Sequence, residues 1–181
     1  MKKTCFGIFV LAFILSCIND SDKKNSDKNI RKEIIDITIK YVSDKFEYAK
    51  ETVDKDGIIT ISDGQVNFVI PVENQIKYII NPSKIKIGLI DNDRIEDAII
   101  TISSSKGQYL EMPENLILIN RDGKLMISRT IEADMTILGI EDGVITAEIL
   151  TRSRNSPLRD CEVCREVVKY RYTMGNLVRI E

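Results

Sequence analysis

Three Asp-Gly dipeptides constrain the fold of this chain more than any other feature of its sequence. Asp63-Gly64, Asp122-Gly123 and Asp142-Gly143 each separate two apolar segments rich in β-branched residues. Both residue types tolerate the positive φ angles of a two-residue type I′ turn, which joins antiparallel strands. Gly175-Asn176 is a fourth pair of this kind near the C-terminus. The sequence therefore predicts four hairpins, over residues 58–70, 116–130, 137–150 and 167–180.

A helical pattern precedes these strands. Apolar residues step by four and three, which predicts a long amphipathic helix whose stripe comprises Ile35, Ile39, Val42, Phe46, Ala49 and Val53. Asn29 or Asp27 can cap its start, and Asp56-Gly57 can end it. Segments 85–89 and 98–102 bring the expected number of strands to about ten. We therefore expect an α+β domain, in which the N-terminal helix packs on one antiparallel β-meander or partly closed barrel.

The N-terminus is typical of an export signal. Lys2 and Lys3 precede an apolar run over residues 6–15, which is shorter than the roughly 20 residues that span a bilayer. The tetrapeptide Ile14-Leu15-Ser16-Cys17 resembles the lipobox of bacterial lipoproteins. This resemblance implies cleavage between Ser16 and Cys17, a diacylglyceryl group on the Cys17 thiol, and acylation of the new amine with a fatty acid such as palmitate. The alternative is an ordinary secretory peptide with a chance cysteine.

These features divide the chain into three parts. Residues 1–16 are the expected lipoprotein signal peptide, residues 17–29 a flexible tether, and residues 30–181 a single α+β domain. The tether is assigned because residues 19–29 hold no apolar side chain to bury. Ile18 follows the lipobox cysteine where many enterobacterial lipoproteins carry an aspartate that retains them at the inner membrane. We therefore expect a lipid-anchored protein of the cell envelope at the outer membrane, on either its periplasmic or its surface face.

The composition excludes several classes of function. The chain contains no histidine, which excludes Ser-His-Asp and Cys-His catalysis and histidine-based zinc sites. Its formal net charge is −2 and it carries no long basic run, so we expect no nucleic-acid partner. The sequence indicates no cofactor and no catalytic residue.

The segment 88–98 carries the pattern closest to a chemical site. It resembles an eroded calcium loop of dockerin, FG-GAP and related extracellular modules, and many small bacterial lipoproteins of unassigned function have such a loop between two strands. The resemblance places Asp91, Asp93 and Asp97 at ligand positions. Leu89 replaces the first ligand and Arg94 replaces the glycine of the sharp turn. Because Ca²⁺ takes 6 to 8 oxygens, we expect no bound metal but an acidic turn in which Arg94 replaces the charge of the ion.

Two further features lie near residue 160. Cys161 and Cys164 form a close pair that we expect to be a structural disulfide in an oxidising envelope; a redox-active pair would need a helix N-terminus. Before this pair, Arg152, Arg154 and Arg159 could bind a carboxylate, a phosphate or an acidic partner. The alternative is mutual neutralisation of these arginines with nearby acidic residues.

Two classes of function remain. The first is a lipid-anchored, non-catalytic binding module that engages an envelope protein or an anionic ligand. The alternative is a carboxylate-dependent envelope hydrolase, which would need two acids at a fixed separation in a cleft. Because no such pair stands out in an apolar setting, the sequence favours the binding module.

Overall fold

The computed structural model describes one helical segment and eleven strands. The described residues are 27–45, 58–62, 65–70, 76–91, 93–106, 109–110, 113–151 and 164–181. The chain divides into two compact units, Met1–Glu33 and Ile34–Glu181. In the first unit only residues 27–33 are described, and they are helical. The predicted signal peptide, Cys17 and the first ten residues of the expected tether lie outside the described residues, and the last three residues of that tether are helical.

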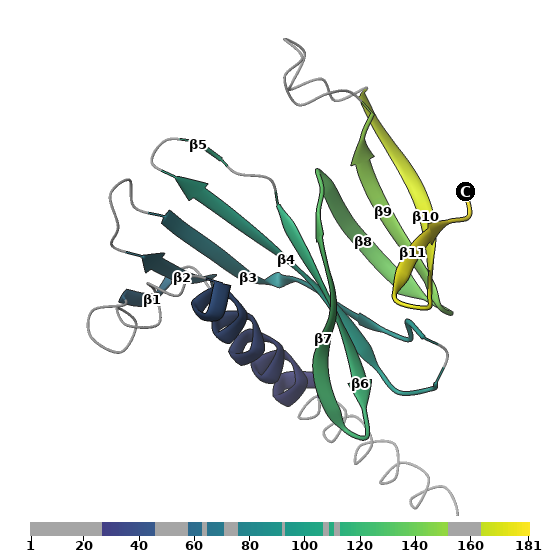
Figure 1. The fold of residues 1–181 in the computed structure, drawn as a ribbon, viewed down its shortest axis with the longest axis horizontal. Helices are drawn as coiled ribbons and strands as arrows, with labels where there is room; N and C mark the ends of the chain where they lie inside the picture. The colour runs from purple at the N-terminus through teal and green to yellow at the C-terminus, as the bar shows by residue number, and fades with distance from the viewer. Residues whose placement is uncertain are drawn as a thin grey trace, which may run out of the picture. The chain divides into compact units, whose positions relative to one another are not determined.

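The strands of the second unit form two antiparallel sheets (Figure 1). The first sheet has the order β1-β2-β3-β4-β6-β7, with β5 paired to β4. Its strands are β1 (Ile58–Ser62), β2 (Gln65–Ile70), β3 (Ile76–Gly88), β4 (Asp97–Lys106), β5 (Tyr109–Leu110), β6 (Glu114–Arg121) and β7 (Lys124–Glu132). The second sheet has the order β11-β10-β9-β8. Its strands are β8 (Met135–Glu141), β9 (Val144–Leu150), β10 (Arg165–Thr173) and β11 (Asn176–Arg179).

This architecture shows that the predicted fold class is wrong. The described chain is mostly β and forms two separate sheets, neither of which closes into a barrel, instead of one meander of about ten strands under a helix. The break falls between β7 and β8, where only Ala133 and Asp134 connect the strands. Neither residue has the positive φ angle that a two-residue hairpin requires. The chain therefore leaves the first sheet at this point and starts the second.

The hairpin turns follow from local chemistry. The turn between β6 and β7 has φ angles of 55° at Asp122 and 82° at Gly123, and Asp142 and Gly143 are similar between β8 and β9. In the last hairpin Thr173 pairs with Asn176, so the turn residues are Met174 and Gly175 (φ 50° and 80°), one position earlier than the predicted Gly175-Asn176. The first predicted turn, at residues 63–64, lies outside the described residues.

The core lies between the facing surfaces of the two sheets. Side chains from both sheets form one buried cluster, which includes Ile90, Ile99, Ile117, Ile119, Met135, Ile137, Ile140, Ile145, Ala147, Val168 and Tyr172. At its margin β3 approaches β8 closely at Gly88. A Cβ atom built on Gly88 would lie 2.9 Å from both Cβ and Cγ2 of Ile140. Only a glycine fits there without displacing a neighbour.

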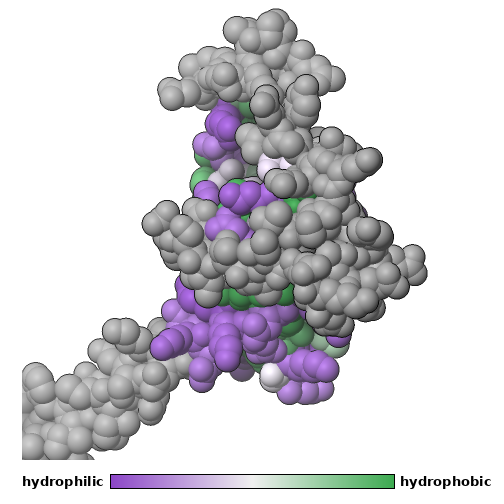
Figure 2. Space-filling model, turned by 90° about the vertical axis from the view of Figure 1, so that its left-hand side faces the viewer, coloured by the Kyte–Doolittle hydropathy of each residue, from purple (hydrophilic) through white to green (hydrophobic). Residues whose placement is uncertain are grey.

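The helix contributes a second buried surface. Within residues 34–45, Ile34, Thr38 and Val42 are fully buried, whereas Ile35 and Ile39 of the predicted stripe are half-buried. The Thr38 hydroxyl donates to the carbonyl of Ile34 at 2.7 Å, which satisfies this polar group inside the apolar face. On the face of the molecule drawn in Figure 2, the described residues that are visible are mostly hydrophilic, with narrow bands of hydrophobic side chains between them.

Candidate functional site

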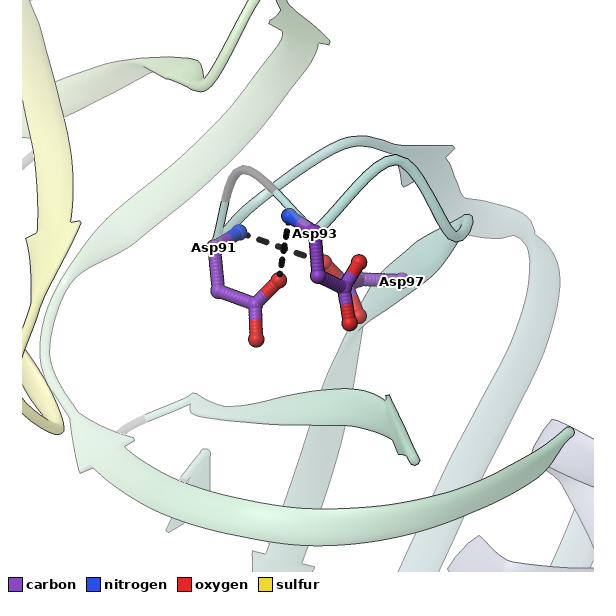
Figure 3. A group of neighbouring side chains, drawn as sticks. All are labelled: Asp91, Asp93 and Asp97. Atoms are coloured by element: carbon purple, nitrogen blue, oxygen red, sulfur yellow. Dashed lines mark hydrogen bonds between the residues drawn. The ribbon is translucent and has the colours of Figure 1, made fainter. Parts of the chain in front are cut away.

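The loop between β3 and β4 brings together the three predicted acidic residues. One carboxylate oxygen each of Asp91, Asp93 and Asp97 lies within 4.8 Å of the other two (Figure 3). Asp97, the first residue of β4, is fully buried. Asp91 is largely covered, with 11% of its side chain exposed, and Asp93 lies further out. The three carboxylates therefore differ in their access to solvent and in what they can bind.

Asp97 holds the loop by accepting hydrogen bonds from three backbone amides. Its Oδ2 accepts from the amides of Ile90 at 2.8 Å and Asp91 at 3.3 Å, and its Oδ1 accepts from the amide of Asn120 on β6 at 2.9 Å. Burial raises the pKa of Asp97, against the opposing effect of these amides. Because both oxygens already serve the backbone, Asp97 has a structural role in joining the loop to β6.

The outer part of the loop is organised by its own side chains. Asp91 Oδ1 accepts from the amide of Asp93 at 3.3 Å, and Asp93 Oδ1 accepts from the amide of Ile95 at 2.8 Å. Bonds of this kind, in which an aspartate carboxylate accepts from the amide two residues ahead, stabilise tight turns. Arg94 has a φ angle of 69°, a left-handed backbone conformation that glycine adopts at lower cost.

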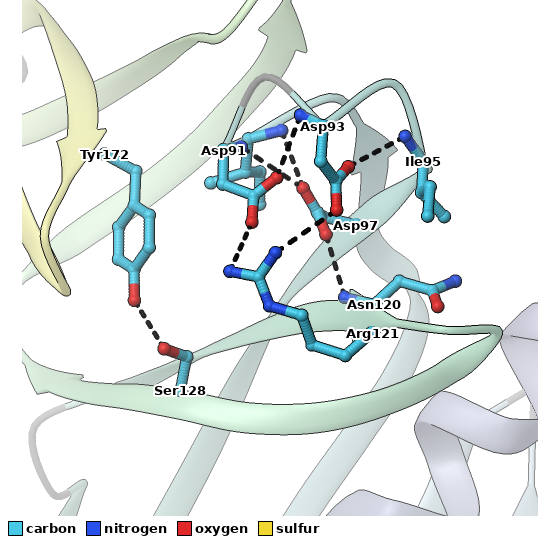
Figure 4. A network of polar contacts seen from close by, with 9 residues as sticks. Asp91, Asp93, Ile95, Asp97, Asn120, Arg121, Ser128 and Tyr172 are labelled. Carbon is cyan, nitrogen blue, oxygen red and sulfur yellow. Dashed lines mark hydrogen bonds and ion pairs between the residues drawn. The ribbon is translucent and has the colours of Figure 1, made fainter.

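The cation that pairs with the described carboxylates of this loop is Arg121, at the end of β6, whereas the sequence had suggested Arg94. Arg121 Nη2 lies 2.7 Å from Asp91 Oδ2, and its Nη1 lies 3.3 Å from Asp93 Oδ2 (Figure 4). The guanidinium therefore bridges the two outer carboxylates. Sequence reasoning did not find Arg121 because nothing local links it to a loop some thirty residues earlier. Only the pairing of β4 with β6 brings the two segments together.

This arrangement favours a structural turn over a metal centre. The carboxylates of the loop already bind three amides through Asp97 and one guanidinium through Asp91 and Asp93. Ca²⁺ would need 6 to 8 oxygens, and it would have to displace Arg121. The expectation that the loop holds no metal stays a prediction.

The predicted arginine cluster and half of the cysteine pair lie outside the described residues. These residues are Arg152, Arg154, Arg159 and Cys161. Cys164 is buried, and its carbonyl accepts bonds from the amide and the hydroxyl of Thr151, each at 2.7 Å. The backbone at Cys164 is thus attached to the end of β9. The disulfide itself stays a prediction.

A second polar cluster joins the helix to the first sheet. Glu114 of β6 is buried and accepts hydrogen bonds from Tyr41 Oη at 2.8 Å and Lys45 Nζ at 2.6 Å. Burial raises the pKa of Tyr41, and Glu114 adds to this effect. Burial alone would lower the pKa of Lys45, but the hydrogen bond and negative charge of Glu114 raise it overall. The cluster is a satisfied ion pair that fastens the helix to β6.

A cavity that the sequence did not indicate lies beside β7. It has a volume of about 540 Å³ and forms where β7 and the 133–134 link face the second sheet. Its lining comprises Arg129, Ile131, Ala133, Asp134, Met135, Ile149, Leu150, Tyr170, Asn176 and Leu177. Five of these residues are apolar or aromatic side chains that pack on the core while staying partly open to the cavity: Ile131, Ala133, Ile149, Tyr170 and Leu177. Alternation along a strand gives Arg129, Ile131 and Ala133 a common face.

Polar contacts hold β7 against the second sheet on this side. The hydroxyls of Ser128 and Tyr172 lie 2.5 Å apart (Figure 4). Arg129 Nη1 donates to the carbonyl of Gly175 at 3.0 Å and to Asn176 Oδ1 at 2.7 Å. These bonds fix the side of the cavity nearest β11. Because they join residues 44 to 47 positions apart, no local pattern in the sequence could have indicated the cavity.

Comparisons with protein-family models, with curated proteins and with solved structures found no match to this chain. Among the described residues, none of the helical segments is both long enough and apolar enough to cross a membrane.

Proposed function

We propose that the chain is a lipid-anchored protein of the cell envelope, acylated at Cys17 and held at the outer membrane, that acts as a non-catalytic binding module. The anchor is supported by the lipobox sequence at residues 14–17. The binding role is supported by the cavity beside β7. A cavity of this size that combines apolar side chains with a few polar groups is the usual form of a small-ligand site.

The composition of the cavity is the observation that carries the binding role. Of its ten lining residues, only Asp134 carries a carboxyl group, and none is a serine, cysteine, threonine or lysine. A carboxylate-dependent hydrolase, the alternative, needs two acids flanking the bond that is cleaved. The described cavity contains one. Among the described residues, one group of three carboxylates lies close together, around Asp97, and it already binds backbone amides and Arg121.

The anchor is tested by labelling in a bacterial host. Wild-type protein and Cys17→Ala are expressed during growth with a clickable palmitate analogue, and the membranes are fractionated. We expect label on the wild type and its recovery with the outer membrane, whereas Cys17→Ala carries no label and leaves the detergent phase. Equal labelling of Cys17→Ala would contradict lipid attachment at this residue.

The binding role is tested with small molecules from the envelope. Full-length protein is equilibrated by dialysis with an envelope extract, and the compounds that it retains are identified by mass spectrometry. We expect compounds that the wild type retains unchanged and that Ile131→Glu, inside the cavity, does not retain. The matched control Val167→Glu changes an exposed residue of β10 outside the cavity. Consumption of a compound by the wild type, lost in Asp134→Asn, would favour the hydrolase.

A further inference from the structure

The cavity beside β7 has opposite charges at its two ends. Arg129 lies at the end near β11, where it contacts Asn176, and Asp134 lies at the end near β9, where its carbonyl accepts from the amide of Leu150 at 3.2 Å. The two charged residues are five positions apart, so their Cα atoms are separated by at most about 17 Å. The lining also includes the apolar side chains of Ile131, Ile149 and Leu177. A ligand that fits along this cavity therefore meets a cation at one end and a carboxylate at the other.

Both charged groups have bonding capacity for a ligand. The two hydrogen bonds from Arg129 to described residues start at Nη1, and a guanidinium carries five N–H donors. Nη2 and Nε can still donate side by side to one carboxylate. Within the described part of the chain, Asp134 forms no ion pair through its side chain, although it is only partly exposed. The ammonium group of a ligand would give this carboxylate the cation that no other described residue supplies.

We propose that this cavity binds a short apolar peptide with free termini, with its C-terminal carboxylate on Arg129 and its N-terminal ammonium on Asp134. This inference rests on the proposed binding function and names its class of ligand. An extended chain spans about 3.3 to 3.6 Å per residue, so three or four residues reach between the two charges once both side chains extend toward the ligand. Side chains of such a peptide would cover Ile131, Ile149 and Leu177.

The acidic end distinguishes a peptide from a simple amphiphile. A fatty acid could place its carboxylate on Arg129 and its chain on the apolar lining. It would then cover Asp134 with hydrocarbon, and the burial of a carboxylate without a partner is strongly unfavourable. A zwitterionic peptide satisfies both ends and leaves neither charge covered and unpaired.

The test uses full-length protein in detergent and four versions of one tetrapeptide of alanine and leucine: with free termini, N-acetylated, C-amidated, and with both termini blocked. Binding is measured by isothermal titration calorimetry. We expect the free peptide to bind, each single block to weaken binding about tenfold, and the doubly blocked peptide to bind weakest. The wild type with these four ligands tests the inference without any variant that could fail to fold.

Variants then assign each terminus to its residue. In Arg129→Gln the free and amidated peptides should bind equally, while acetylation still weakens binding. In Asp134→Asn the free and acetylated peptides should bind equally, while amidation still weakens binding. The matched controls Arg171→Gln and Glu141→Gln change exposed charges of the second sheet that do not line the cavity, and both should bind as the wild type does. Circular dichroism checks that each variant is folded.

Equal binding of the free and the doubly blocked peptide, or no binding of any peptide, would overturn the inference. Decanoate is titrated in the same way as a fatty acid without an ammonium group. Tighter binding of decanoate than of the free peptide would also overturn the inference. None of these would remove the label from Cys17 or the envelope compounds retained by the wild type, so the proposed function could survive them. Recovery of cleaved peptide would instead refute the non-catalytic function itself.

Discussion

Substitution of Gly88 by alanine tests the close approach of the two sheets. The added methyl carbon would lie 2.9 Å from Cβ and Cγ2 of Ile140 and 3.0 Å from its carbonyl oxygen. Carbon atoms in contact normally lie about 3.5 to 4.0 Å apart, so the strands must separate locally by roughly half an ångström or more. Ile140 is buried in the core and Gly88 continues a paired strand, so neither can move independently.

We expect Gly88→Ala to lower the free energy of unfolding by about 1 to 3 kcal/mol, the usual cost of overpacking a core. Gly139→Ala is the matched control, because nothing lies within 4 Å of a Cβ at that position, one residue before Ile140 on β8. Its backbone φ is not positive, so alanine should be neutral there or stabilise by up to about 1 kcal/mol. The two variants make the same chemical change and differ only in the space around it.

The assay is urea denaturation followed by far-UV circular dichroism, with a check that the slope m is unchanged. A double-mutant cycle with Ile140→Ala adds a second measurement. The two substitutions should be less than additive by about 0.5 kcal/mol or more, since removal of Cγ2 relieves part of the clash. If Gly88→Ala proved as stable as Gly139→Ala, the packing of β8 on β3 inferred from these distances would be refuted.

Three further predictions concern the polar clusters. Tyr41 and Lys45 both have a pKa raised above their ordinary values of 10.0 and 10.5. At a pH above these ordinary values, the folded state therefore holds more protons than the unfolded state. The free energy of unfolding should consequently fall as pH rises. Thermal melts between about pH 9 and 12 should show this fall, and it should be shallower in Tyr41→Phe and Lys45→Met; a wild-type stability that rises over this range would contradict it. Arg121→Met should lower the free energy of unfolding by only about 1 kcal/mol, because 55% of the Arg121 side chain is exposed to solvent. Millimolar calcium should leave the melting temperature of the wild type unchanged, and a rise would show that the acidic loop binds the ion in spite of Arg121.

The sequence by itself determined two of the described hairpin turns of this protein. The Asp-Gly pairs at 122–123 and 142–143 set left-handed turns because aspartate and glycine adopt positive φ at little cost, whatever lies around them. The last turn lies one residue before its predicted position. Gly175 can supply a positive φ angle as either the first or the second turn residue, and the pairing of Thr173 with Asn176 makes it the second.

Only the tertiary structure decided which strands share a sheet and which residues meet across it. The pairing of β4 with β6 brings Asn120 and Arg121 to the acidic loop, so the charge that we assigned to Arg94 comes from another strand. The division between β7 and β8 creates both the core between the sheets and the cavity beside Arg129. The physical reason is the range of the interactions. A turn depends on the torsion angles of two residues, whereas a core, an ion pair or a cavity depends on side chains that are distant in sequence and meet only after the sheets have packed.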